Sequence, residues 1–471
     1  MEYHIWLNNE NPLLLRGLCA AVKNRITHTM LFLAVLLSMP KDMRSQNASA
    51  NGVQSFSLQD CIDYALKNQP NIMQATLGLK IARTTNFINI SGWLPQVGAT
   101  GNFAFYPQPT TSLISNPVNP NLPLVAERSA IQASFIPALN GTQTIFSPTL
   151  LYSATTAKLY TKAATQIIDS SKIYVAVAVT KAFYNLLLNL QEIDVLKSDT
   201  VMLAKSVRDA YHQYVGGIVD VTDYQEATIT LNNTVAQLRQ ANENITPQYA
   251  GLKQLMGFPP HNDFNVKFDT AQMMKDIGLD TTQQLQYEKR IEYQQLATDR
   301  ALQHKLTGFY EFSFLPTLGA YFNYNYEYES NKLNNLLATA YPNSVVGLSL
   351  NLPLFTGLSR IESVRKSKMQ EKLFDYSQQN LESVIYTQYT QAIANYNSNL
   401  FNMHAQQDNS AMAKKVYTVV EMQYKQGIVP YLNVITAQSN YISSEIGYLN
   451  ALFQVLSSKI DVEQAMGQIS Y

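Results

Sequence analysis

The sequence is poor in the charged residues on which most soluble domains depend. Only 14% of its 471 residues are charged, against roughly 25% in typical soluble domains. The 34 basic residues balance 34 acidic ones, and a nucleic-acid-binding protein needs a basic surface to neutralise phosphates. We therefore expect no nucleic-acid partner. Tyrosine is abundant, with 29 residues, and this residue suits strands and membrane interfaces.

Catalytic and metal-binding motifs are also absent. The sequence has no HExxH, GxSxG, P-loop or dinucleotide-binding pattern, and no pair of its six histidines has metal-ligand spacing. Asp220 and Asp223 could act as a general acid and base, but favourable charge at a helix N-terminus is the simpler interpretation. We expect no enzymatic activity, no cofactor and no metal site.

Long hydrophobic runs and cysteine pairs are lacking as well. The apolar run at 30–40 is too short to cross a bilayer, and no other stretch reaches about 18 consecutive apolar residues. The two cysteines are Cys19 and Cys61, so removal of the N-terminus would exclude an intrachain disulfide. The sequence predicts no membrane-spanning helix.

The N-terminus is typical of an export signal. Within residues 1–50, basic residues precede the apolar run at 30–40, and small residues at 48–50 offer a cleavage site. The 29 residues before Met30 are long for a leader, so translation could begin at Met1 or at Met30. We expect an exported protein.

The rest of the chain contains an internal repeat. QYVGGIVDV at 213–221 and QYKQGIVPY at 423–431 share five residues in a seven-residue window, and WLPQVGA at 93–99 matches FLPTLGA at 314–320. This repetition predicts a duplicated unit of about 200 residues, far longer than a solenoid repeat of roughly 20–50 residues. The predicted units span 51–257 and 282–471, and an irregular segment at 258–281 joins them.

Each unit contains one very long run without glycine or proline. The runs cover 149–215 and 358–426, and each could form a helix roughly 100 Å long. Ser147-Pro148 is a helix start, and glycines follow both runs. Shorter helices are predicted to return over 219–246 and 431–466. Helices this long need partner helices along their whole length, and a solvated coiled-coil rod is one alternative.

Alternating apolar and polar residues predict two β-hairpins, at 96–146 and 316–354, with polar connections at 107–129 and 329–343. About ten residues of alternation are typical of outer-membrane barrel strands, although a half-buried sheet in a soluble protein is the alternative. A barrel needs about eight strands or more. Several chains must therefore share one barrel if these strands cross a membrane, because open edges in lipid leave backbone groups unpaired.

Four ordered motifs carry a resemblance to a known family. They are SLQDCIDYALKNQPNI near the start, WLPQVG at a strand entry, VGLSLNLPLFTG before a long helix, and YxxG turns between helices. The chain resembles TolC-type outer-membrane efflux proteins over nearly all of 55–470. The resemblance implies a mixed α/β membrane protein. It would be a trimeric β-barrel of four strands per chain, twelve in total, continued by a long α-helical coiled-coil barrel.

The resemblance also implies a function, that of an exit duct of a tripartite efflux or type I secretion system. The duct would lie in outer-membrane lipid and extend into the periplasm as a homotrimer. A periplasmic adaptor would contact its helical tips and connect it to an inner-membrane pump. The implied adaptor contacts are Gly216, Gly217, Ile218, Gly427 and Ile428. Two alternatives are a periplasmic coiled-coil scaffold without a pore and a porin, although a porin needs more strands and no such helices.

Family gate residues map onto Asp223 and Tyr424, which implies a charge-assisted hydrogen bond from the phenol to the carboxylate at the closed periplasmic end. Val429 stands where the family has a gate arginine. Two family aspartates beyond the second tip fall on Asn433 and Thr436. We therefore expect a weaker gate and weaker attraction of cations at this constriction.

Overall fold

The structure is a computed structural model. It describes residues 54–117, 121, 123–267, 273, 277–279 and 284–469. The predicted export signal at 1–50 lies outside the described residues. Residues from Gln54 onward form one unit, and the description below concerns that unit.

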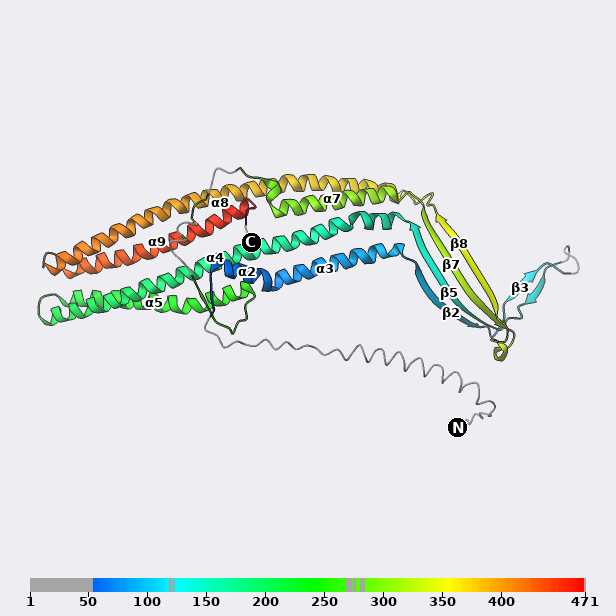
Figure 1. Ribbon diagram of the computed structural model, residues 1–471, viewed down its shortest axis with the longest axis horizontal. Helices are drawn as coiled ribbons and strands as arrows, with labels where there is room; N and C mark the ends of the chain where they lie inside the picture. Colours follow the sequence, from blue (N-terminus) through cyan, green and yellow to red (C-terminus); the bar gives the residue numbers. More distant parts are fainter. Residues whose placement is uncertain are drawn as a thin grey trace, which may run out of the picture. The chain divides into compact units, whose positions relative to one another are not determined.

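Two long helices run from the sheet to the opposite end of this unit, as predicted (Figure 1). Helix α4 spans Pro148–Val215 and helix α8 spans Ser359–Lys425. Helix α4 begins as expected, with Ser147 in an extended N-cap conformation and proline at the first helical position. Proline is favourable there because the first backbone N–H groups of a helix have no intrahelical partner.

Two shorter helices return from the far end, α5 (Val221–Met256) and α9 (Tyr431–Ala465). The prediction ended α5 at 246, yet the helix continues through Pro247 for about three more turns. Leu252 and Met256 in this extension are fully buried. The burial of these apolar side chains offsets the backbone hydrogen bond that proline removes.

The remaining helices lie between the middle of the unit and the sheet. They are α2 (Leu58–Asn68), α3 (Pro70–Ile90) and η1 (Ser91–Trp93) in the first half, and η2 (Tyr287–Lys289) and α7 (Ile291–Phe312) in the second. On the sheet side α4 packs between α3 and α7, and α7 packs on α8. Between the middle of the unit and the end opposite the sheet, α4 packs between α5 and α9, and α9 packs on α8.

Four strands form one antiparallel sheet in the order β2-β5-β7-β8. They are β2 (Gln96–Phe105), β5 (Ala133–Phe146), β7 (Thr317–Ser330) and β8 (Tyr341–Asn351). The prediction extended the last strand to 354. The strand ends earlier because Pro353 has no N–H to donate to a neighbouring strand.

Two further strand pairs were not expected from the sequence. Strands β3 (Thr111–Ile114) and β4 (Val125–Arg128) form a small antiparallel hairpin inside the predicted loop at 107–129. Strand β1 (Gln54–Phe56) pairs in parallel with β6 (Phe264–Val266), inside the segment that we expected to be irregular. The second connection of the large sheet contains the short helix η3 (Leu333–Asn335).

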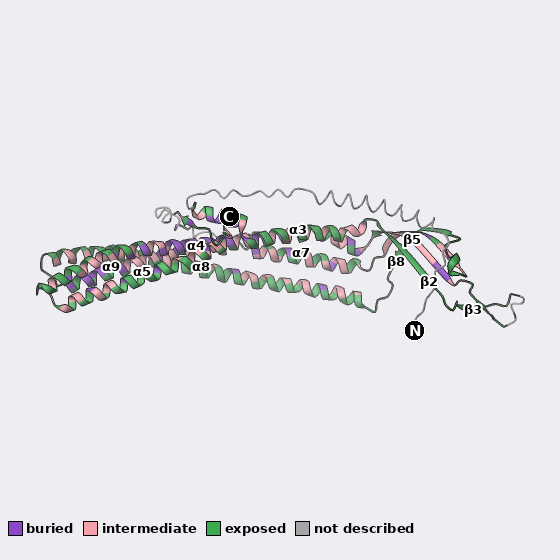
Figure 2. Ribbon diagram, turned by 90° about the horizontal axis from the view of Figure 1, so that it is seen from below, coloured by how far each residue is buried: buried purple, intermediate pink, exposed green. Residues whose placement is uncertain are grey.

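The main hydrophobic core lies in the middle of the unit, where α2, β1 and β6 pack against α4, α5, α8 and α9 (Figure 2). Gly257 and Gly467 close this region in equivalent ways, with φ of 67° and 68°. A Cβ at Gly257 would lie 2.6 Å from the backbone oxygen of Asn68, and one at Gly467 would lie 2.7 Å from that of Lys289. Glycine is therefore required at both positions by conformation and by space.

Helix α4 contains one 18-residue window with a mean hydropathy of 1.5, apolar enough for a membrane crossing. However, 56% of that window is buried inside the protein. The apolar window is explained by packing against the neighbouring helices, so it does not require lipid.

Candidate functional sites: helical tips, helix seam and strand surface

The two repeated turns lie at the same end of the unit, opposite the sheet (Figure 1). Gly217 and Gly427 have φ of 71° and 73°. The N–H groups of Gly217 and Ile218 donate to the carbonyls of Tyr214 and Gln213, at 2.9 Å each. The second turn repeats this pattern at equivalent positions, so both tips are Schellman motifs that need a left-handed glycine.

Each tip presents one exposed isoleucine. Ile218 is 76% exposed and Ile428 is 64% exposed. Gly216 takes an ordinary helical conformation as the C-cap of α4, so its glycine is not required by conformation. Exposed apolar residues at the end of a molecule are typical of a partner surface.

The two residues that we predicted to form the gate lie near the tips, but the predicted hydrogen bond is not the one that forms. The hydroxyl of Tyr424 donates to Oε1 of Gln213 at 2.5 Å, rather than to Asp223. Burial raises the pKa of the Tyr424 phenol, so the hydroxyl stays protonated and acts as the donor. Asp223 lies in the first turn of α5, where its charge is favourable. Sequence reasoning missed Gln213 because it lies 211 residues away from Tyr424 in the chain.

Aromatic packing surrounds this hydrogen bond. The rings of Tyr424 and Tyr431 lie 5.2 Å apart, and Tyr431, Val434 and Ile435 are buried with Ala210 in a small core at the tips. The core joins the α4–α5 hairpin to the α8–α9 hairpin. Asn433 and Thr436, on the first turns of α9, are exposed.

A buried carboxyl lies in the seam between α4 and α9. Leu196 and Leu203 are fully buried at heptad spacing, and Asp199 lies between them, only 3% exposed. Its Oδ2 atom has no hydrogen-bond partner among the described residues. Burial, together with the nearby carboxyl of Glu445 on α9, raises the pKa of Asp199 to about 7. Sequence reasoning missed this residue, although an acid within an apolar heptad stripe was visible.

The register gives the large sheet one apolar and one polar face. The apolar face includes Phe103, Phe135, Leu139, Phe322, Tyr324, Val346 and Leu348. On the opposite face, the amide of Asn140 donates to Thr100 at 3.0 Å, and Asn323 donates to Asn140. These bonds form a polar ladder across three strands. One apolar and one polar face is the pattern of a membrane barrel strand.

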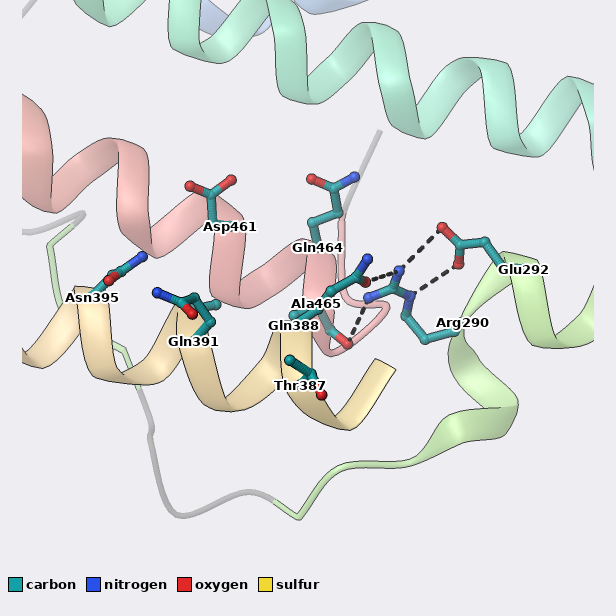
Figure 3. A pocket seen from close by; sticks show the side chains of 10 residues that line it. Arg290, Glu292, Thr387, Gln388, Gln391, Asn395, Asp461, Gln464 and Ala465 are labelled. Carbon is teal, nitrogen blue, oxygen red and sulfur yellow. Dashed lines mark hydrogen bonds and ion pairs between the residues drawn. The ribbon is translucent and has the colours of Figure 1, made fainter. Parts of the chain in front are cut away.

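A polar pocket of about 540 Å³ lies where α7 begins and α9 ends (Figure 3). Its buried Arg290 forms a two-point ion pair with Glu292, at 3.0 and 3.1 Å, and also donates to the Ala465 carbonyl and the Gln388 side chain. Although burial opposes ionisation, these bonds from Arg290 lower the pKa of Glu292. Arg290 thereby joins α7, α8 and α9. Among the described residues, no group of three or more His, Cys, Asp or Glu side chains could hold a metal ion.

Long paired helices attached to a two-faced sheet define a class of protein, the outer-membrane channels with a helical extension. Residues 61–258 and 311–468 match the family model described as "Outer membrane efflux protein". The match covers more than half of the chain, so the chain belongs to the outer membrane efflux protein family.

Individual relatives agree with this assignment. The outer membrane protein TolC of Vibrio cholerae is 19% identical over 429 residues, which are 89% of this chain and 93% of TolC. The CmeC outer membrane channel of Campylobacter jejuni has a TM-score of 0.67 at 18% identity, covering 87% of this chain and 85% of CmeC. The MtrE outer membrane channel of Neisseria gonorrhoeae, solved in an open state, has a TM-score of 0.65 at 16% identity, covering 87% and 88%. The CmeC and MtrE structures are both outer membrane channels.

Proposed function

We propose that three copies of this chain form the exit duct of a tripartite efflux or type I secretion system. The single observation that carries the proposal is the four-stranded sheet, which has one apolar face and two edge strands, β2 and β8, without a partner strand in the described part of the chain. In lipid, such edges must be paired, because no water is available to satisfy the backbone. Copies of the same chain supply the missing partners.

The width of a duct requires more than two copies. Two copies would give about eight strands, and the interior of an eight-stranded barrel is filled by side chains or by one small ligand. Three copies give twelve strands, since each chain contributes four. The helices would then continue the barrel into the periplasm, and the membership of the outer membrane efflux protein family supports this arrangement.

We further propose that the tips bind a periplasmic adaptor that opens the duct and connects it to an inner-membrane pump. Ile218 and Ile428 support this proposal, because both are exposed and lie on rigid turns of the same geometry. The alternative, a periplasmic scaffold without a pore, would leave the apolar face of the sheet in water. That face is unfavourable for a soluble protein.

The oligomeric state tests the proposal. Native mass measurement of the mature protein in mild detergent should give a trimer that conducts ions in planar bilayers, and a heat-denatured sample provides the monomer control. A monodisperse monomer that conducts ions would contradict the shared barrel, and a trimer without conductance, even in the variant Tyr424→Phe that should weaken the closed state, would contradict the duct.

A further inference from the structure

The four barrel strands contain only two charged side chains. Both are acidic, Glu327 and Glu329 of β7, and strands β2, β5 and β8 have no Asp, Glu, Lys or Arg at all. A strand surface with charge of a single sign produces an uncompensated field. The position of these two carboxylates within the sheet therefore determines which ions the surface attracts.

Both glutamates lie on the polar face of the sheet. Glu329 pairs in register with Ser134 of β5, and the amide of Asn325 donates to Oε1 of Glu327 at 3.3 Å. Asn325 is only 8% exposed, so this bond comes from a side chain that is itself fixed by packing. The intervening side chain of Tyr328 points to the opposite face, where it stacks against Phe135.

The two glutamates lie at the end of the sheet that is remote from the helices. Helix α7 leads into β7 at Thr317, and Glu327 pairs with Tyr341, the first residue of β8. This pair is the last of the β7–β8 ladder, and in Figure 1 that end of β7 and β8 lies at the lower right, away from the helices. In the proposed duct, this end is the outer mouth of the barrel.

We propose that Glu327 and Glu329 make the outer mouth of the duct selective for cations. The inference rests on the proposed trimer, in which the polar face lines the lumen and the mouth carries about six carboxylates. Residues i and i+2 of a strand are about 7 Å apart, which is within the Debye length of about 8 Å at physiological ionic strength. The fields of neighbouring carboxylates therefore add.

Other charges near this end do not cancel the effect on the strand surface. In the described part of the two connections, Glu127 and Arg128 lie together on β4, and Lys332 follows β7. Glu127 and Arg128 have opposite signs and lie on a separate hairpin. Lys332 offsets one of the two strand carboxylates, so each chain keeps an excess of one acidic group at the mouth.

The proposal separates ion selectivity from the gate. The tip positions Asn433 and Thr436 carry no charge, so these two positions supply no cation preference. The strand carboxylates place it at the outer mouth, where it acts on solutes in either direction of passage.

Reversal potentials in planar bilayers test the inference. The purified trimer should prefer potassium over chloride in a tenfold KCl gradient. The double variant Glu327→Gln, Glu329→Gln should lower the potassium-to-chloride permeability ratio by about threefold or more, with each single variant between the two. Glu127→Gln removes the same charge outside the sheet and should leave the ratio unchanged.

Gel mobility with and without heating verifies that each variant remains a trimer. A conducting trimer whose permeability ratio is the same in wild type and double variant refutes the selectivity inference alone. An equal change in Glu127→Gln also refutes it, because the field would then not come from the strand surface. A trimer that carries no current, even in the variant Tyr424→Phe, refutes both the duct and its selectivity.

Discussion

Replacing Asp199 by asparagine should tighten the seam between α4 and α9, and the effect should grow with pH. The pKa of Asp199 rises from an ordinary 3.8 to about 7 because the carboxyl is buried near Glu445. Each pKa unit corresponds to about 1.4 kcal/mol, so ionised Asp199 costs the closed seam roughly 4 kcal/mol. Asparagine has nearly the same shape and does not ionise.

The sign follows from the direction of the shift. A carboxyl with a raised pKa binds its proton more tightly in the closed seam than in water. The seam is therefore most stable below about pH 4, and it loses this stability as pH rises through the pKa of Asp199, about 7. Above that pH the loss is complete.

The groups that face Asp199 do not reverse this sign. On α9 these are Glu445 and Tyr441, and on α8 Tyr417, whose hydroxyl donates to the sulfur of Met202 at 3.1 Å. Burial is the main cause that raises the pKa of Tyr441, to about 12, so this phenol remains neutral. On α5, residues 227–238 contain no titratable side chain.

Hydrogen exchange of the backbone amides in α4 and α9 measures the opening of the seam. We expect the protection factor of Asp199→Asn, divided by that of the wild type, to be about 100-fold larger at pH 8 than at pH 5. Between these pH values the closed seam of the wild type loses proton-linked stability that corresponds to about two pKa units. Asp194→Asn, an exposed acid on the same helix, is the matched control. A ratio that is equal at both pH values would refute the burial argument.

Two further predictions concern the tips. Replacing Ile218 and Ile428 together by aspartate should abolish export in cells while the trimer remains intact. Valine at both positions is the control and should preserve export. Unchanged export by the aspartate variant would place the adaptor contact elsewhere. Tyr424→Phe removes only a hydroxyl and should raise basal channel opening as much as Gln213→Ala, since the two side chains share one hydrogen bond of roughly 1 kcal/mol. Asp223→Ala leaves that bond and should have a smaller effect. Single-channel recordings measure the opening of each variant. If Asp223→Ala opened the channel as much as Tyr424→Phe, the carboxylate and not the amide would hold the gate.

Much of the architecture was predictable from local sequence patterns. Runs without glycine or proline predicted α4 and α8, and Ser147-Pro148 predicted where α4 begins. Alternation of period two predicted the two hairpins. The repeated Gln-Tyr and Gly-Ile pairs predicted the tips, because a Schellman turn requires a left-handed residue at one fixed position, as at Gly217 and Gly427. These features depend on residues close together in the chain, so the sequence alone determined them.

The tertiary structure decided which distant groups meet. Local sequence could not show that Tyr424 bonds to Gln213 rather than to Asp223, nor that β1 pairs with β6, because each contact joins segments about 200 residues apart. The burial of Asp199 depends equally on α9, which supplies the other wall of the seam. Hydrogen bonding and desolvation act at a few ångströms, whereas sequence patterns describe only neighbours along the chain. The packing of segments far apart in the sequence therefore set the hydrogen bond of Tyr424 and the burial of Asp199.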